Sequence, residues 1–416
     1  MQEFPTGLAH FRRAYAQHRS EKAQLKHREP KAVRETNDIR ANNTGGDGGW
    51  TLSPTRLKHC PPNFIDPATV IGCEALYWSA KKCWKGVGRK YSAQNYSLNI
   101  IANTLKLARE LKSGKYKEGK THIVKITYPK PRTALAIIFR DRVYQRSIND
   151  NALYSQMVRT FIYHNLACQK GKGTTMAREE FKKMLRKAFI KYGTNQFQIL
   201  ACDVKGYYDN MLHAETNRIV RKNCDPWTAE RTIETLERQY RFHGYKGYNP
   251  GSQMVQIAGI SYLNEYDHYV KEQMLRKLHL RYMDDTHTCG SPSENMEAIK
   301  CEMDKELNKV GLWLHPDKTK IARAADGVMF LGFIFKVTDT GKVLMFRDPA
   351  KVNALKRKMK RLAALIAKGR REIETMDECW ECAKACMAEG NSQRLLKNME
   401  QFVNQLKEDV RNAKGN

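Results

Sequence analysis

The sequence predicts an α+β fold in which an antiparallel sheet is combined with helices. Residues 278–289 alternate apolar and polar side chains around an Asp-Asp pair, a pattern typical of two strands joined by a tight turn. Residues 197–203 form an apolar run that ends in Asp203, as expected of a buried central strand. Residues 179–191 and 296–310 have the apolar spacing of amphipathic helices.

The composition indicates a polyanionic partner. The 416 residues include 73 Lys and Arg against 44 Asp and Glu, which gives a formal net charge of +29. Cations that neutralise phosphates release counterions, so such an excess favours nucleic acid. No apolar run has the length of a membrane-spanning helix, and the first residues lack the pattern of a secretory signal. We therefore expect a cytoplasmic protein with no membrane partner.

The cysteines do not predict a metal centre. The chain has 11 of them, scattered along its length, and in a reducing compartment we expect free thiols. The one cluster is Cys379, Cys382 and Cys386, which lies at helical spacing in a segment rich in Glu, Ala and Lys. Structural zinc usually takes four ligands, and no fourth ligand stands at a suitable spacing.

The acid pair Asp284 and Asp285 would ordinarily be read as a solvated turn. Two neighbouring carboxylates repel each other unless a cation is supplied, and a hard divalent ion with oxygen ligands is the natural one. Asp203, at the end of its buried strand, adds a third carboxylate. Three acids in a strongly basic chain favour a divalent metal site that handles phosphates.

Basic segments flank these acids. Residues 121–128 and 133–139 are predicted strands joined by Pro129-Lys130-Pro131-Arg132, where cations can clamp a triphosphate; a solvated hairpin is the alternative. Lys170 and Lys172 stand among glycines, which indicates a contact with a phosphate backbone. Residues 66–117 are expected to be helical, residues 327–335 and 343–346 to form a hairpin, and the tail from Pro349 to be helical. Further cations for nucleic acid lie on that tail: Lys356, Arg357 and Lys360.

In this order the motifs resemble those of a reverse transcriptase, specifically a compact bacterial one. Tyr282-Met283-Asp284-Asp285 is similar to the family's Tyr-x-Asp-Asp box, and residues 203–209 are similar to its first palm motif. Residues 129–132 and 141–145 resemble the fingers blocks. Residues 314–319 and 330–333 resemble late palm blocks, the second being the primer grip.

The resemblance implies an RNA-directed DNA polymerase of right-hand shape. Asp203, Asp284 and Asp285 would be the catalytic acids and, with the backbone carbonyl of Val204, would hold two Mg²⁺ ions, with Mn²⁺ as an alternative. Tyr208 stands where the family places an aromatic that collides with a ribose 2′ oxygen, which favours dNTPs. The other implied dNTP contacts are Lys130, Arg132, Gln256 and Lys318.

The same resemblance implies a division of the chain. The expected parts are a basic N-terminal extension (1–67), fingers (68–195), palm (196–212 and 250–346), a fingers insertion (213–249), and a small helical thumb with the C-terminal tail (347–416). One loop departs from the family pattern, with Pro250 in place of a frequent Gln and Val255 in place of a Ser. Nucleotide contacts through that loop are therefore open.

The biological setting is less determined. The extension and the basic C-terminal helices favour a defence-associated enzyme that copies a cognate non-coding RNA. A diversity-generating enzyme and a template-independent or protein-primed DNA polymerase stay open, as does a non-catalytic RNA-binding protein on a polymerase fold. Expected partners are the RNA template, the DNA product and dNTPs, and a homo-oligomer is an open alternative.

Overall fold

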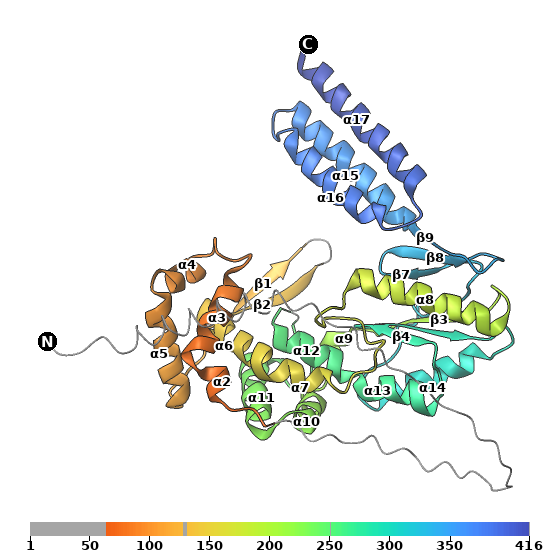
Figure 1. Ribbon diagram of the computed structural model, residues 1–416. Helices are drawn as coiled ribbons and strands as arrows, with labels where there is room; N and C mark the ends of the chain where they lie inside the picture. The colour runs from red at the N-terminus through yellow and green to blue at the C-terminus, as the bar shows by residue number, and fades with distance from the viewer. Residues whose placement is uncertain (1–63, 128–130, 250, 416) are drawn as a thin grey trace, which may run out of the picture. The chain divides into compact units, whose positions relative to one another are not determined.

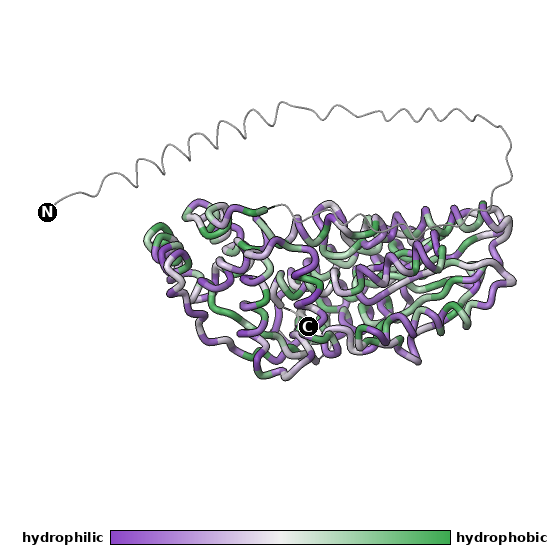
Figure 2. Tube along the Cα trace, turned by 90° about the horizontal axis from the view of Figure 1, so that it is seen from below, coloured by the Kyte–Doolittle hydropathy of each residue, from purple (hydrophilic) through white to green (hydrophobic). Residues whose placement is uncertain are grey.

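The computed structural model describes residues 64–127, 131–249 and 251–415, all within the unit Cys60–Asn416 (Figure 1). The other unit, Met1–His59, and with it nearly all of the predicted N-terminal extension, lies outside the described residues. Hydrophilic positions interrupt hydrophobic ones along the helices (Figure 2). Among the described residues, no helix has both the length and the apolar character needed to cross a bilayer.

The first helices form a small cluster of their own. They are α2 (Ala68–Ile71), α3 (Cys73–Trp84), α4 (Tyr91–Leu98) and α5 (Ile100–Lys112), and α6 (Phe139–Ile148) packs with them. Their core is lined by Leu76, Leu107, Phe139 and Val143, each at most 4% exposed. The expected helical stretch is thus present but divided into short helices.

A hairpin follows, made of β1 (His122–Ile126) and β2 (Arg132–Ala136). The prediction that its second strand reaches residue 139 is wrong, since Phe139 begins α6 and is buried in the helical cluster. Asp141, in the first turn of α6, accepts hydrogen bonds from Tyr116 and Gly119. These bonds attach the start of α6 to the segment before β1.

The central sheet is antiparallel, with the order β4-β5-β3-β6. Its strands are β3 (Gln198–Asp203), β4 (His279–Tyr282), β5 (Asp285–Gly290) and β6 (Lys320–Arg323). β3 lies in the middle, as its apolar run predicted, and the strand-turn-strand prediction for residues 278–289 is confirmed. In the register, Asp203 stands opposite Asp285.

Helices cover both faces of this sheet. Successive residues of a strand point to opposite faces. Accordingly, Ile199 packs with Phe181 of α8 (Thr174–Tyr192). Leu200 and Cys202 instead belong to the cluster that includes Met303 of α14 (Met296–Asn308). Figure 1 shows α8 on one side of the sheet and α14 on the other.

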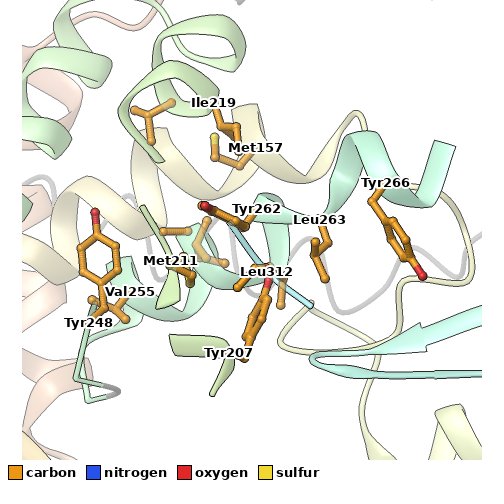
Figure 3. Packing of buried hydrophobic residues seen from close by; sticks show 14 of the residues in the cluster. Met157, Tyr207, Met211, Ile219, Tyr248, Val255, Tyr262, Leu263, Tyr266 and Leu312 are labelled. Atoms are coloured by element: carbon orange, nitrogen blue, oxygen red, sulfur yellow. The ribbon is translucent and has the colours of Figure 1, made fainter. Parts of the chain in front are cut away.

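The largest core lies on the α14 side and gathers several helices. Figure 3 shows Tyr207, Tyr262 and Leu312 meeting there from separate segments. The elements around it are α7 (Tyr154–Val158), α9 (Tyr207–Asn210), α10 (His213–Asn223), α11 (Pro226–Tyr240), α12 (Gln253–Tyr262) and α13 (Asn264–His268), with the π-helical turns η1 (Asn149–Leu153) and η3 (Tyr269–Gln273) and the 3₁₀ turn η2 (Arg241–His243).

A second antiparallel sheet contains β7 (Val328–Phe330), β8 (Phe333–Val337) and β9 (Val343–Arg347). The predicted hairpin is confirmed, since β8 pairs with β9, but its first segment, residues 327–335, is two strands and not one, because the chain turns back at Leu331 and Gly332. Both of these residues have positive φ, at 46° and 82°, as a tight hairpin turn requires. α8 contacts this sheet as well as the central one.

Three helices complete the chain: α15 (Pro349–Ala367), α16 (Glu374–Ala388) and α17 (Gln393–Gly415). They share a core that includes Met359, Ile366 and Trp380. Asn391, between α16 and α17, exchanges hydrogen bonds with the backbone of Met345 in β9. The described chain thus has the mixture of helices and antiparallel sheets expected of an α+β fold, and the predicted domain boundaries stay predictions.

Candidate active site

The turn between β4 and β5 carries the acid pair. β4 ends at Tyr282 and β5 begins at Asp285, so Met283 and Asp284 form the turn itself. Met283 has a φ of 59°, in the left-handed region that a methionine rarely adopts. Asp203 ends β3 opposite Asp285. The sheet therefore gathers the three predicted acids at one edge.

Burial and mutual repulsion perturb these acids. Burial raises the pKa of Asp284, and the charge of Asp203 raises it further. Burial likewise raises the pKa of Asp285 to about 7, with additional contributions from Asp284 and Asp203. Asp284 and Asp285 are thus harder to ionise, first because they are buried and then because other acids are close. Such an excess of negative charge is relieved by a cation.

Lys318 supplies one cation. Its Nζ lies 2.8 Å from Oδ1 of Asp203, although 115 positions separate the two residues. The segment that carries Lys318 is fixed beside β3 by its backbone: His315 donates to the carbonyl of Asp203 at 2.7 Å, and Lys205 donates to Trp313 at 3.0 Å. This docking explains why the late motif stands next to the first one.

Residues 129–335 match the family model described as "Reverse transcriptase (RNA-dependent DNA polymerase)". The chain carries a reverse transcriptase domain. The matched range runs from the β1–β2 connection into β8 and contains all three acids and Lys318. The domain indicates an RNA-directed DNA polymerase, a nucleotidyltransferase, and implies the palm and fingers of that fold. No curated protein matches the chain.

Reverse transcriptase domains generally use divalent metal ions. Within the described part of the chain, no three His, Cys, Asp or Glu side chains are already arranged around a metal position. The donor chemistry nevertheless fits a hard cation: Asp203, Asp284 and Asp285 offer carboxylate oxygens, and burial together with the charge of neighbouring acids raises the pKa of Asp284 and Asp285. Val204, 2% exposed and next to Asp203, could add its carbonyl.

Tyr208 of the reverse transcriptase lies on α9 against α12. A Cβ added to Gly259 of α12 would stand 2.8 Å from the Tyr208 hydroxyl, so only glycine allows this approach. The hydroxyl is buried and has no hydrogen-bond partner among the described residues. Burial, followed by the charges of Cys168 and Asp284, raises the pKa of Tyr208. The neighbouring Tyr207 donates its hydroxyl hydrogen to the Gly259 carbonyl.

The structure explains one of the two departures from the family pattern, Val255 in the first turn of α12. Ser252 caps the helix, because its side chain accepts a hydrogen bond from the backbone N–H of Val255 at 3.2 Å. The Val255 side chain is completely buried in the main core. A serine at this position would bury a hydroxyl that needs a hydrogen-bond partner. Gln256 is exposed on the same helix. Pro250 lies outside the described residues.

The other predicted dNTP contacts belong to the fingers hairpin. Lys130 lies outside the described residues, and of Arg132 the backbone position at the start of β2 is described. Close by, a cavity of about 210 Å³ is lined by residues from the hairpin, from the basic stretch after α3, from α6 and from the α12 loop. Among these are Lys85, Lys90 and Arg142. The tertiary structure thus brings the basic stretch beside the α12 loop.

The loop that carries Lys170 and Lys172 packs beside the turn between β4 and β5. Cys168 Sγ lies 3.8 Å from Met283 Sδ. The ammonium of Lys172 donates to the carbonyls of Tyr163 at 2.8 Å and Asn165 at 2.9 Å, so it also fastens the loop. Lys170 is exposed, with its ammonium 5.0 Å from the centre of the Tyr154 ring. Contact of these lysines with nucleic acid stays a prediction.

The basic residues predicted on the tail lie on α15. Lys356, Arg357 and Lys360 are all exposed, and Lys356 stands 5.8 Å from the centre of the Phe402 ring in α17. No contact described here joins these three residues to the acids. Cys379 is half-buried on α16, while Cys382 and Cys386 are exposed there.

Sequence reasoning missed a buried ion pair beneath the turn. Arg281 and Asp267 are both completely buried, and their side chains are joined by hydrogen bonds of 2.7 to 3.0 Å. An arginine within an apolar strand next to the acid pair was the available signal. A buried guanidinium needs a carboxylate or carbonyl partner.

Proposed function

We propose that this reverse transcriptase extends a primer along an RNA template at a site built from Asp203, Asp284 and Asp285. The observation that carries the proposal is the pairing of Asp203 with Asp285 across β3 and β5, with Asp284 on the adjoining turn. Carboxylates that hinder one another's ionisation are poised to share a cation.

These acids, with the Val204 carbonyl, would hold two Mg²⁺ ions, or Mn²⁺ in their place. The chemistry supplied by the bound ions is activation of the primer 3′ oxygen and neutralisation of the leaving pyrophosphate. Lys318 would add a positive charge of the protein to this site. Its hydrogen bond to Asp203 raises the pKa of the ammonium, which therefore stays charged at neutral pH. From this position it can neutralise a phosphate or give it a proton.

Tyr208 selects the sugar of the incoming nucleotide. Its ring is held by α12 through the close approach to Gly259, so it cannot retreat to admit a 2′ hydroxyl. Lys130, Arg132 and Gln256 would bind the rest of the dNTP. Lys170, Lys172, Lys356, Arg357 and Lys360 would contact the phosphates of the template and product, which are sequence-independent contacts.

The template we favour is a cognate non-coding RNA in an antiphage defence system in the cytoplasm. The net charge of +29 suits a retained RNA. Sequencing the nucleic acid that copurifies with the protein, and the DNA made on it, tests this part. DNA complementary to one bound RNA supports the proposal, mutagenised copies of a coding repeat favour a diversity-generating role, and DNA attached to a Tyr or Ser favours protein priming.

The chemistry is tested by primer extension on a defined RNA template with Mg²⁺ and dNTPs. Asp203→Asn and Asp284→Ala should each abolish extension while leaving the melting temperature near that of the parent. Tyr208→Ala should admit NTPs. Extension that survives both acid substitutions would assign the chemistry to other residues.

A further inference from the structure

The catalytic turn holds an unfavourable backbone conformation at one residue. Met283 has a φ of 59°, and it is followed directly by Asp284. A side chain with a Cβ is disfavoured there, and such a conformation persists when its surroundings fix it. The residues that contact the Met283 backbone therefore decide where Asp284 points.

Arg281 makes that contact from beneath the turn. Its Nη1 donates to the Met283 carbonyl at 2.9 Å, and its Nη2 donates to the carbonyl of Ile260 in α12, also at 2.9 Å. The guanidinium is completely buried. Its planar, rigid fork ties the turn to the helix on which the Tyr208 ring rests.

Asp267 of α13 holds the guanidinium in place. Arg281 Nε lies 2.8 Å from Oδ1 of Asp267, and Nη2 lies 2.7 Å from Oδ2, which is a two-pronged contact. Burial opposes ionisation of Asp267, but the charge and hydrogen bonds of Arg281, with His279 Nε2 3.7 Å from the carboxylate, lower the pKa of the carboxyl overall. Asp267 is therefore charged at neutral pH and matches the guanidinium.

We propose that Arg281 is the positioning residue of the catalytic turn, and that Asp267 serves it by fixing the guanidinium that holds the Met283 carbonyl. The inference rests on the proposed function, because it explains the position of Asp284. A pair that served only folding would behave differently. A buried ion pair can often be replaced by apolar side chains without loss of the fold, whereas the bond to Met283 cannot be replaced in that way.

The test removes both charges together with Arg281→Met and Asp267→Leu, so that no buried charge is left alone. The control is Arg218→Gln with Glu265→Gln, which removes an exposed ion pair between α10 and the same helix α13. Primer extension is measured with Mg²⁺ and varied dNTP. We expect kcat of the apolar pair to fall by about 10- to 100-fold, because misplacement by about 1 Å has effects of this size. KM for dNTP and the melting temperature should stay close to those of the control.

A rescue separates positioning from support of the fold. Met283→Gly, added to the apolar pair, provides a residue that adopts positive φ without a steric penalty. It should raise kcat of that variant by about tenfold, since the turn can then form without Arg281. Should the apolar pair not fold, Arg281→Lys with and without Met283→Gly carries the same test, because lysine lacks the fork.

Parental kcat in the apolar pair, or in Arg281→Lys where that variant is used, would overturn the inference. Failure of Met283→Gly to raise kcat in the same variant would overturn it as well. A different variant shows whether the proposed function itself is wrong. Asp284→Ala would then retain extension whatever happens at Arg281.

Discussion

Replacing Gly259 with alanine perturbs the contact that holds the Tyr208 ring. The added Cβ would lie 2.8 Å from the hydroxyl oxygen, 3.0 Å from Cε1 and 3.1 Å from Cζ of Tyr208. Ordinary van der Waals contact begins at 3.4 Å, so the ring must retreat from α12 by about half an ångström. Tyr207 stands on α9 beside it, with ring centres 5.5 Å apart, and restricts where the ring can go.

Two opposing terms determine the change in the free energy of unfolding. Overpacking of this kind costs about 1–3 kcal/mol. Alanine gains about 1 kcal/mol over glycine inside a helix. Gly259→Ala should therefore destabilise the protein by about 0–2 kcal/mol. Tyr208→Phe alone should be neutral or slightly stabilising, because it removes a buried hydroxyl that has no partner among the described residues.

A double-mutant cycle isolates the contact. Urea unfolding of the parent, Gly259→Ala, Tyr208→Phe and the double variant should give a coupling energy of about 1 kcal/mol, since the two groups touch. Some of the clash stays in the double variant, because Cε1 and Cζ are still present. Single-turnover incorporation of a dNTP then measures the effect of each substitution on kcat/KM. We expect Gly259→Ala to lower kcat/KM for a dNTP about tenfold, as the displaced ring narrows the sugar site.

Two results would contradict this reasoning. Equal effects of Gly259→Ala with and without Tyr208→Phe would mean that the side chains do not touch. An unchanged kcat/KM for dNTPs, together with a confirmed coupling energy, would mean that Tyr208 packs on α12 but does not face the sugar.

Three further predictions concern other residues. Lys318→Ala should lower kcat of primer extension about 100-fold by removing the cation from Asp203, whereas Lys305→Ala, on the exposed side of α14, should leave it unchanged. Burial lowers the pKa of His287 from 6.5 to about 4. As the pH falls through this range, the unfolded chain binds a proton at His287 before the folded protein does, so the free energy of unfolding decreases. The parent should lose up to about 3 kcal/mol more than His287→Gln across that window in urea unfolding, and parallel curves would contradict this. Asp225→Ala should lower the free energy of unfolding by about 2–4 kcal/mol, because the carboxylate caps α11 and binds buried Gln156 at 2.7 Å; a loss below 1 kcal/mol would refute this role.

Local patterns in the sequence predicted much of the sheet. The alternation in residues 278–289 and the apolar run ending at Asp203 correspond to strands that pair in the structure. Errors arose where a chain reversal interrupts an apolar run. Residues 327–335 look continuous, but positive φ values at Leu331 and Gly332 divide them into two strands. Phe139 reads as part of a strand, although the helical cluster buries it at the start of α6.

The sequence alone predicted which side chains would take part in the chemistry, because carboxylates at strand ends and a basic composition are local properties. Only the tertiary structure decided what holds them. Lys318 reaches Asp203 from 115 positions away, Tyr208 rests on a glycine of another helix, and Arg281 finds Asp267 beneath the turn. These contacts depend on strand register and helix packing between distant segments. A sequence pattern with a period of two or 3.6 residues predicts on which face of a strand or helix a side chain lies, but not which residue it contacts.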